Sequence, residues 1–96
     1  MSNYPNGEFV TNAHYWLGEI YLIKKSYRSS RAEFEYVIAN APKSPRIPDA
    51  KFKVGLIQLY QGQRAEARRA FLAVKKAYPG STAAQLAGIQ LKQLGS

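Results

Sequence analysis

The sequence contains no cysteine and a single histidine, and each shortage excludes a class of chemistry. Without cysteine there is no disulfide, no thiolate nucleophile and no cysteine-bound zinc. His14 stands without a second histidine or paired carboxylates at metal-ligand spacing, so we expect no metal site. No serine belongs to a recognisable nucleophile motif, and no glycine-rich phosphate loop is present. We therefore expect a protein that is not an enzyme and binds no cofactor.

Acidic residues are also scarce. Six acids oppose fourteen lysines and arginines, which gives a formal net charge of +8. Such an excess attracts nucleic acid, anionic lipid or acidic protein over long distances. The sequence shows neither a nucleic-acid-binding motif nor an alternation of aromatic and basic residues, so we expect no nucleic-acid partner. A solvated basic face is the favoured interpretation, and charge-driven binding of an acidic partner is the alternative.

Long hydrophobic runs are absent as well. No apolar stretch reaches the roughly 20 residues that cross a bilayer, and the first residues do not read as a signal peptide. We therefore expect no membrane insertion. A hydrophobic content of 46% nevertheless excludes disorder. A chain of 96 residues corresponds to one small domain, which buries about 60% of the surface of its unfolded chain.

What the sequence does contain is a repeat of 37 residues. A shift of 37 positions superposes Ala13 on Ala50 and Ala87, Gly18 on Gly55, Phe34 on Phe71, Val37 on Val74, and Pro5 on Pro42 and Pro79. Repeats of this length are typical of helical solenoids. Two unrelated amphipathic hairpins are the alternative, and the agreement at several positions argues against it.

The repeated residue types fit pairs of closely packed antiparallel helices. Two helix axes approach closely only where side chains are small. Gly18 and Gly55 supply the gap on the first helix of each unit, and Ser30 and Ala67 supply it on the second. The matching phenylalanines fill the space one turn further along, and a proline eight residues later ends the second helix.

The pattern predicts an all-α chain with five helices, at residues 11–25, 26–40, 48–61, 64–78 and 82–94. Gly62 is placed to end the third helix, Ser81 to cap the fifth helix and Gly95 to follow its end. Residues 1–10 are expected to be a short tag and the remnant of a preceding repeat. Repeat A then covers residues 11–42, a proline-rich turn 43–47, repeat B 48–80 and a capping helix 81–96.

These motifs resemble the tetratricopeptide repeat. Leu17-Gly18-x-x-Tyr21, Ser30, Phe34 and Pro42 follow its pattern, as do Val54-Gly55, Ala67, Phe71 and Pro79. The usual period is 34 residues, so each unit here is longer, and His14 and Lys51 replace the tryptophan usual near the start of the first helix. The resemblance implies a tetratricopeptide (TPR) helical-hairpin solenoid of two repeats plus a C-terminal capping helix.

A longer set of motifs resembles one family of such proteins. Tyr4-Pro5-Asn6-Gly7, residues 12–18, residues 44–55 and Tyr78-Pro79-Gly80-Ser81 are similar to the C-terminal domain of the YbgF/CpoB family, the Tol-Pal-associated cell division coordinators. The resemblance implies a periplasmic protein with a signal peptide and a trimerising coiled coil. Its implied role is to bind TolA and to couple the peptidoglycan synthesis machinery to outer-membrane constriction. Single phrases also resemble outer-membrane assembly lipoproteins, so an envelope assembly scaffold is the alternative.

A partner-binding surface is expected on the first helices of the two units, which line the concave side of stacked hairpins. Counting along the motif places these residues on the outward side: Asn12, Tyr15, Glu19, Leu22, Ile23, Asp49, Phe52, Leu56, Leu59 and Tyr60. Their mixture of aromatic, aliphatic and polar groups suits a segment of a partner protein. The alternative is that half of them pack against a neighbouring unit.

The first helix is also expected to lack the neighbour on which it would stack. An exposed apolar face of this kind favours self-association or exchange of helices between chains.

Overall fold

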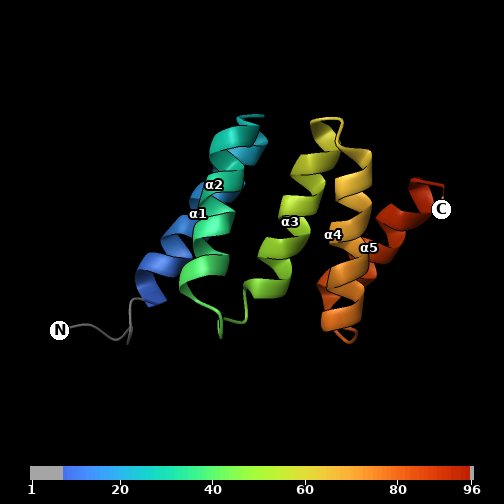
Figure 1. Ribbon diagram of the computed structural model, residues 1–96. Coiled ribbons are helices and arrows are strands. Elements are labelled where there is room, and N and C mark those ends of the chain that lie inside the picture. The colour runs from blue at the N-terminus through green and yellow to red at the C-terminus, as the bar shows by residue number, and fades with distance from the viewer. Residues whose placement is uncertain (1–7, 96) are drawn as a thin grey trace.

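A computed structural model describes residues 8–95, which form five α-helices and, within that range, no strand. They are α1 (Glu8–Ile23), α2 (Tyr27–Asn40), α3 (Ile47–Tyr60), α4 (Arg64–Ala77) and α5 (Thr82–Gln93). Figure 1 shows them following one another in chain order, each running opposite to the helix before it. The prediction of an all-α fold is confirmed. Residues 1–7 of the tag and repeat remnant predicted at residues 1–10, and Ser96 of the capping segment, lie outside the described residues.

Two helices begin earlier than predicted. α1 begins at Glu8, three residues before the expected start, so residues 8–10 are helical and belong to the first hairpin. No proline or glycine stands between Gly7 and Thr11, so nothing in the local chemistry stops the helix earlier. α3 begins at Ile47, with Pro48 in its first turn, where the missing N–H leaves no helical hydrogen bond unmade.

Each hairpin closes on a contact between a glycine and a phenylalanine. A Cβ atom on Gly18 would lie 2.8 Å from Cζ of Phe34, and one on Gly55 would lie 2.8 Å from Cε1 of Phe71. Both rings are fully buried. In the first hairpin the Ser30 hydroxyl also donates a hydrogen bond of 2.7 Å to the carbonyl oxygen of Gly18. The expectation that these glycines permit close helix packing is confirmed.

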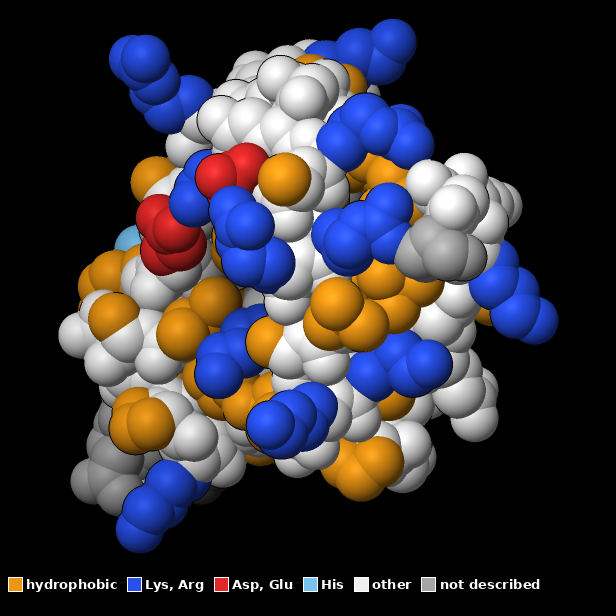
Figure 2. Space-filling view, turned by 45° about the vertical axis from the view of Figure 1, so that its right-hand side comes forward, with side chains coloured by type: hydrophobic (Ala, Val, Ile, Leu, Met, Phe, Trp, Pro, Cys, Tyr) orange, Lys and Arg blue, Asp and Glu red, His pale blue; other side chains and the backbone are white. Residues whose placement is uncertain are grey.

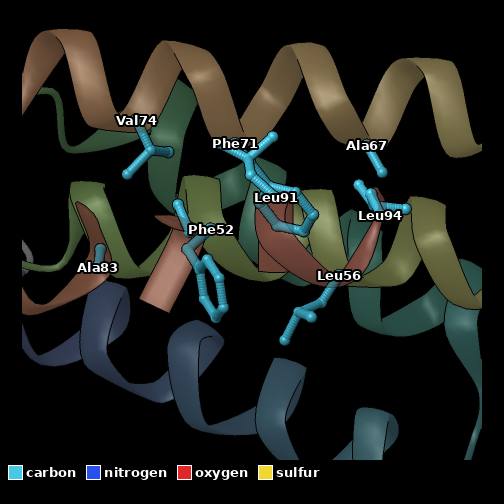
Figure 3. Close-up of a cluster of buried hydrophobic side chains, with 9 residues drawn as sticks. Phe52, Leu56, Ala67, Phe71, Val74, Ala83, Leu91 and Leu94 are labelled. Atoms are coloured by element: carbon cyan, nitrogen blue, oxygen red, sulfur yellow. The ribbon is translucent and has the colours of Figure 1, made fainter. Parts of the chain in front are cut away.

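Two apolar clusters hold the hairpins together. The first joins α1, α2 and α3 through Tyr15, Phe34, Val37, Ile47, Ala50 and Ile57. The second joins α3, α4 and α5 through Phe52, Leu56, Ala67, Phe71, Val74, Ala83, Ala87, Leu91 and Leu94. Figure 3 shows α4 directing Ala67, Phe71 and Val74 toward the residues of α3 and α5. α5 is therefore part of the core, as expected of a capping helix.

The two tight turns within the hairpins have the same hydrogen bonds but different residues. Gly62 follows α3 with a φ of +84°, and Lys25, in the matching position after α1, has a φ of +62°. In each turn the next residue donates its N–H to a carbonyl five residues back, Ser26 to Tyr21 and Gln63 to Gln58, both at 2.8 Å. This Schellman geometry places glycine in a left-handed conformation without cost, whereas lysine adopts it with strain.

We predict that Gly55→Ala destabilises the fold. The added Cβ overlaps the fully buried Phe71 ring, which places the overpacking cost in the upper part of its range, at about 2–3 kcal/mol, and the gain in helix propensity of about 1 kcal/mol offsets it only partly. Chemical denaturation should show a net loss of about 1–2 kcal/mol in the free energy of unfolding. Gly88→Ala is the matched control, because a Cβ there has no contact closer than 3.8 Å. An unchanged or higher stability of Gly55→Ala would contradict the packing argument.

We predict the opposite effect for Lys25→Gly. Glycine removes the strain of a left-handed lysine, so the free energy of unfolding should rise by up to about 1 kcal/mol. Lys24→Gly, one residue earlier and outside the left-handed region, should not stabilise the protein. Parallel thermal melts of both variants check this, and equal effects at the two positions would refute the assignment of strain to Lys25.

Candidate functional site

The surface residues expected on α1 and α3 fall into three groups. Ile23 and Tyr60 are exposed, at 81% and 53%. Partly buried are Asn12, Glu19, Leu22, Asp49 and Leu59, and buried are Tyr15, Phe52 and Leu56. The ten residues therefore do not form one continuous exposed surface.

The three buried residues belong to the core. The Phe52 ring lies 5.5 Å from the Phe71 ring, and the Tyr15 ring lies 5.5 Å from the Phe34 ring. Leu56 packs in the same cluster as Phe52. These side chains present little area to a partner, and truncating them would remove core contacts. Binding by the rest of the predicted set stays a prediction.

Two polar members of the set meet at a hollow near the start of α1 and α3. Asn12 and Asp49, which occupy equivalent positions 37 residues apart, line it together with Ser44, Pro45 and Arg46. Its volume is about 230 Å³. Two of the predicted residues, one from each unit, are thus brought to the same place, and the proline-rich turn forms the rest of the lining.

Arg46 is the residue of this hollow that the sequence prediction missed. Its guanidinium lies 4.6 Å from the ring centre of Tyr15 and 5.0 Å from that of Trp16, which is a favourable cation–π arrangement. Within residues 8–95 it forms no ion pair with a carboxylate. The matching position in the first repeat is Phe9, so the repeat pattern contained no signal for a cation here.

The environment of Tyr15 keeps its hydroxyl protonated. Burial raises the pKa of Tyr15 above its ordinary value of 10.0, and the negative charges of Glu19 and Asp49 raise this pKa further, while Arg46 opposes the shift. The phenol is neutral at physiological pH even at its ordinary pKa, and the raised pKa extends its neutral range to higher pH.

The middle of the predicted surface is closed by an ion pair. Glu19 on α1 lies 3.1 Å from Nζ of Lys53 on α3. Beyond this pair, at the far ends of the helices, Tyr60 packs against Tyr27 with ring centres 5.6 Å apart, and Ile23 projects into solvent. The polar hollow and the apolar end are therefore two separate contact areas.

His14 has a structural role. Its Nδ1 pairs with the Glu33 carboxylate, and its ring stacks on Tyr36 at 3.8 Å between centroids. These contacts join α1 to α2. Among the described residues no group of three His, Cys, Asp or Glu is arranged to hold a metal ion, and no helix in residues 8–95 is long and apolar enough to cross a membrane.

α1 also carries an apolar stripe that residues 8–95 leave uncovered. It consists of Val10, Leu17, Ile20 and Ile23, all exposed. The counterparts of Val10 and Ile20 one repeat later, Ile47 and Ile57, are buried in the cluster with α2. In α3 this face packs on the preceding helix pair, whereas in α1 no described element covers it.

The positive charges avoid α1. All fourteen lysines and arginines lie between Lys24 and Lys92, and α1 contains none. Figure 2 shows Lys and Arg side chains spread over the face it presents, interleaved with hydrophobic side chains, with acidic side chains at one side only.

The comparisons with known proteins concern the second hairpin. The sequence model of the tetratricopeptide repeat family matches residues 49–81, which contain most of α3 and all of α4. No curated protein matches the chain. The helix pairs and this match together show a tetratricopeptide-type helical-hairpin fold, as predicted. Tetratricopeptide repeats generally mediate protein–protein interactions and are typically not enzymes.

Proposed function

We propose that this array of tetratricopeptide-type hairpins is an interaction module that binds a segment of a partner protein across the starts of α1 and α3. The observation that carries the proposal is the hollow between these helices. Equivalent residues of the two units, Asn12 and Asp49, converge there beside Arg46, which forms no ion pair with a carboxylate of residues 8–95.

The chemistry of the hollow suits a peptide segment. The Asn12 amide both donates and accepts hydrogen bonds, the Asp49 carboxylate accepts them and the Arg46 guanidinium donates them. A peptide backbone offers the complementary N–H and carbonyl groups in one plane. The exposed Trp16 ring beside Arg46 supplies apolar area for a neighbouring side chain.

The proposed partner is TolA, and the proposed setting is the periplasm. This assignment rests on the motifs between Tyr4 and Ser81 that resemble the YbgF/CpoB family. In that setting the module belongs to a trimeric protein that links the peptidoglycan synthesis machinery to outer-membrane constriction. An envelope assembly scaffold with another partner remains the second proposal, because the matched residues are largely those that build the fold.

We predict that the soluble domains of TolA shift the NMR signals of Asn12, Arg46 and Asp49 at physiological salt. Arg46→Ala should weaken this binding about tenfold, because a hydrogen bond to a charged group contributes about 1.5–3 kcal/mol. Arg28→Ala, an exposed arginine on α2, is the matched control and should bind like the unmodified protein. Shifts confined to Arg68 and Lys75 would move the site to the basic face. Absence of any shift would refute TolA as partner.

We propose in addition that two copies of the chain associate through the apolar stripe on α1. Copies with a net charge of +8 repel one another, and α1 is the helix without lysine or arginine. Two such faces therefore meet with the least repulsion, and their contact removes exposed apolar side chains from water.

We predict that sedimentation velocity detects a rise in mean mass with protein concentration. Ile20→Glu places a charge in the centre of the stripe, at a residue 47% exposed in the single chain, and should return the protein to a monomer. Leu72→Glu, which introduces the same charge on α4 at a side chain of similar exposure, should leave the association intact. A monomer at every concentration would exclude this association.

A further inference from the structure

A second hollow lies between α4 and α5, and it shares no lining residue with the hollow between α1 and α3. Its volume is about 600 Å³. Leu72 and Lys75 of α4 line it together with Gln85, Gly88, Ile89 and Lys92 of α5. Leu72 and Ile89 are each 51% exposed, so the hollow presents apolar side chains to solvent between two lysines.

The repeat of 37 residues assigns to each position of α5 an equivalent position on α3, and α4 covers these positions of α3. Subtracting 37 from Gly88, Ile89 and Lys92 gives Lys51, Phe52 and Gly55 of α3. On α3 these positions are in contact with α4 and its C-cap. Phe71 lies against Gly55 and 5.5 Å from the Phe52 ring, and Lys51 lies over the Tyr78 ring.

On α5 the same positions have no helix over them within residues 8–95. Phe52 is 5% exposed, whereas its counterpart Ile89 is 51% exposed. The face of α3 that receives α4 therefore has an open counterpart on α5 within residues 8–95, with Lys92 in the place of Gly55. An antiparallel helix is the element that fits it.

Gly88 supports this interpretation independently. A glycine inside a helix costs about 1 kcal/mol relative to alanine. Gly18 and Gly55 are required, because any Cβ there would overlap a phenylalanine ring, but a Cβ on Gly88 would make only ordinary contacts with Nζ and Cε of Lys75, at 3.8 and 4.0 Å. Packing within the described chain therefore gives no reason for this glycine. A glycine is needed at this position if a large side chain of a partner packs directly on the helix backbone.

The charge around the hollow indicates the kind of helix. Residues 64–95 contain six lysines and arginines and one acid, Glu66, which pairs with Arg69 at 3.0 Å. Lys75 and Lys92 form no ion pair with any described carboxylate. A helix with carboxylates on its flanks complements them, whereas the apolar Leu72 and Ile89 do not suit a phosphate backbone.

We propose that the hollow between α4 and α5 is the docking site for an acidic amphipathic helix of a partner protein, which lies on α5 as α4 lies on α3. A large apolar side chain of this helix rests on Gly88 between Leu72 and Ile89, and its carboxylates pair with Lys75 and Lys92. Lys92 is the residue of α5 that corresponds to Gly55 of α3. The apolar side chain of the partner helix therefore contacts α5 one helical turn earlier, at Gly88. The site involves none of the residues of the hollow between α1 and α3 and does not depend on their function.

The test uses a probe designed from the chain itself. It is a blocked, fluorescently labelled peptide of residues 64–78 in which Arg68, Arg69, Lys75 and Lys76 are replaced by glutamate, since α4 is the helix that occupies the equivalent place on α3. Fluorescence anisotropy at physiological salt measures its binding to the full chain. We expect saturable binding below 1 mM, at least tenfold weaker binding of the same peptide carrying Phe71→Ala, and at least tenfold weaker binding of the unmodified basic peptide.

Variants of the protein locate the site. Gly88→Ala should raise the melting temperature by a few degrees, through helix propensity, while it weakens peptide binding at least fivefold. Lys75→Glu should weaken binding at least tenfold. Lys76→Glu, the neighbouring exposed lysine outside the hollow, is the matched control and should change binding less than threefold.

Any of the following results would overturn the proposal. One is absence of peptide binding up to 1 mM. Another is unchanged binding by the Gly88→Ala protein, whose higher melting temperature would prove that it is folded. The third is an equal loss for Lys75→Glu and Lys76→Glu, or displacement of the peptide by a short RNA duplex at equal concentration, either of which would indicate attraction to diffuse charge.

Discussion

The contact of a phenylalanine ring with a glycine backbone determines how near the two helices of each hairpin come. Phe34 against Gly18, and Phe71 against Gly55, bring a fully buried ring onto a bare helix surface. Once each pair is set, its remaining apolar faces pack on the next helix, α2 on α3 and α4 on α5. The relative placement of α1 and α3, and with it the hollow at Asn12 and Asp49, depends on these two contacts.

Local chemistry made most of the fold predictable. Gly62 and Gly95 end helices in the left-handed region, and the Ser81 hydroxyl accepts the N–H of Ala84 as an N-cap does. These features depend on residues within one turn of each other. The start of α1 was less predictable, because residues 8–10 bear no residue that either begins or stops a helix.

The candidate site was predictable only in part. Asn12 and Phe52 occupy the same predicted surface, but whether such a side chain is exposed depends on how closely α3 and α5 approach their neighbours, which no local pattern encodes. Arg46 comes from a loop whose path is set by three prolines. The Glu19–Lys53 ion pair lies in the middle of the predicted surface and divides it into two short areas, so that it is not one continuous groove.

The distribution of charge along the chain leaves the α1 end of the molecule less positive than the rest. Its longest dimension is 50 Å, with α1 at one end and α5 at the other (Figure 1). The first helix holds two acids and no lysine or arginine, and residues 64–95 hold six cations and one acid. In the field of a negatively charged protein or surface the molecule therefore rotates before contact, so that its C-terminal helices lead and α1 trails on the far side.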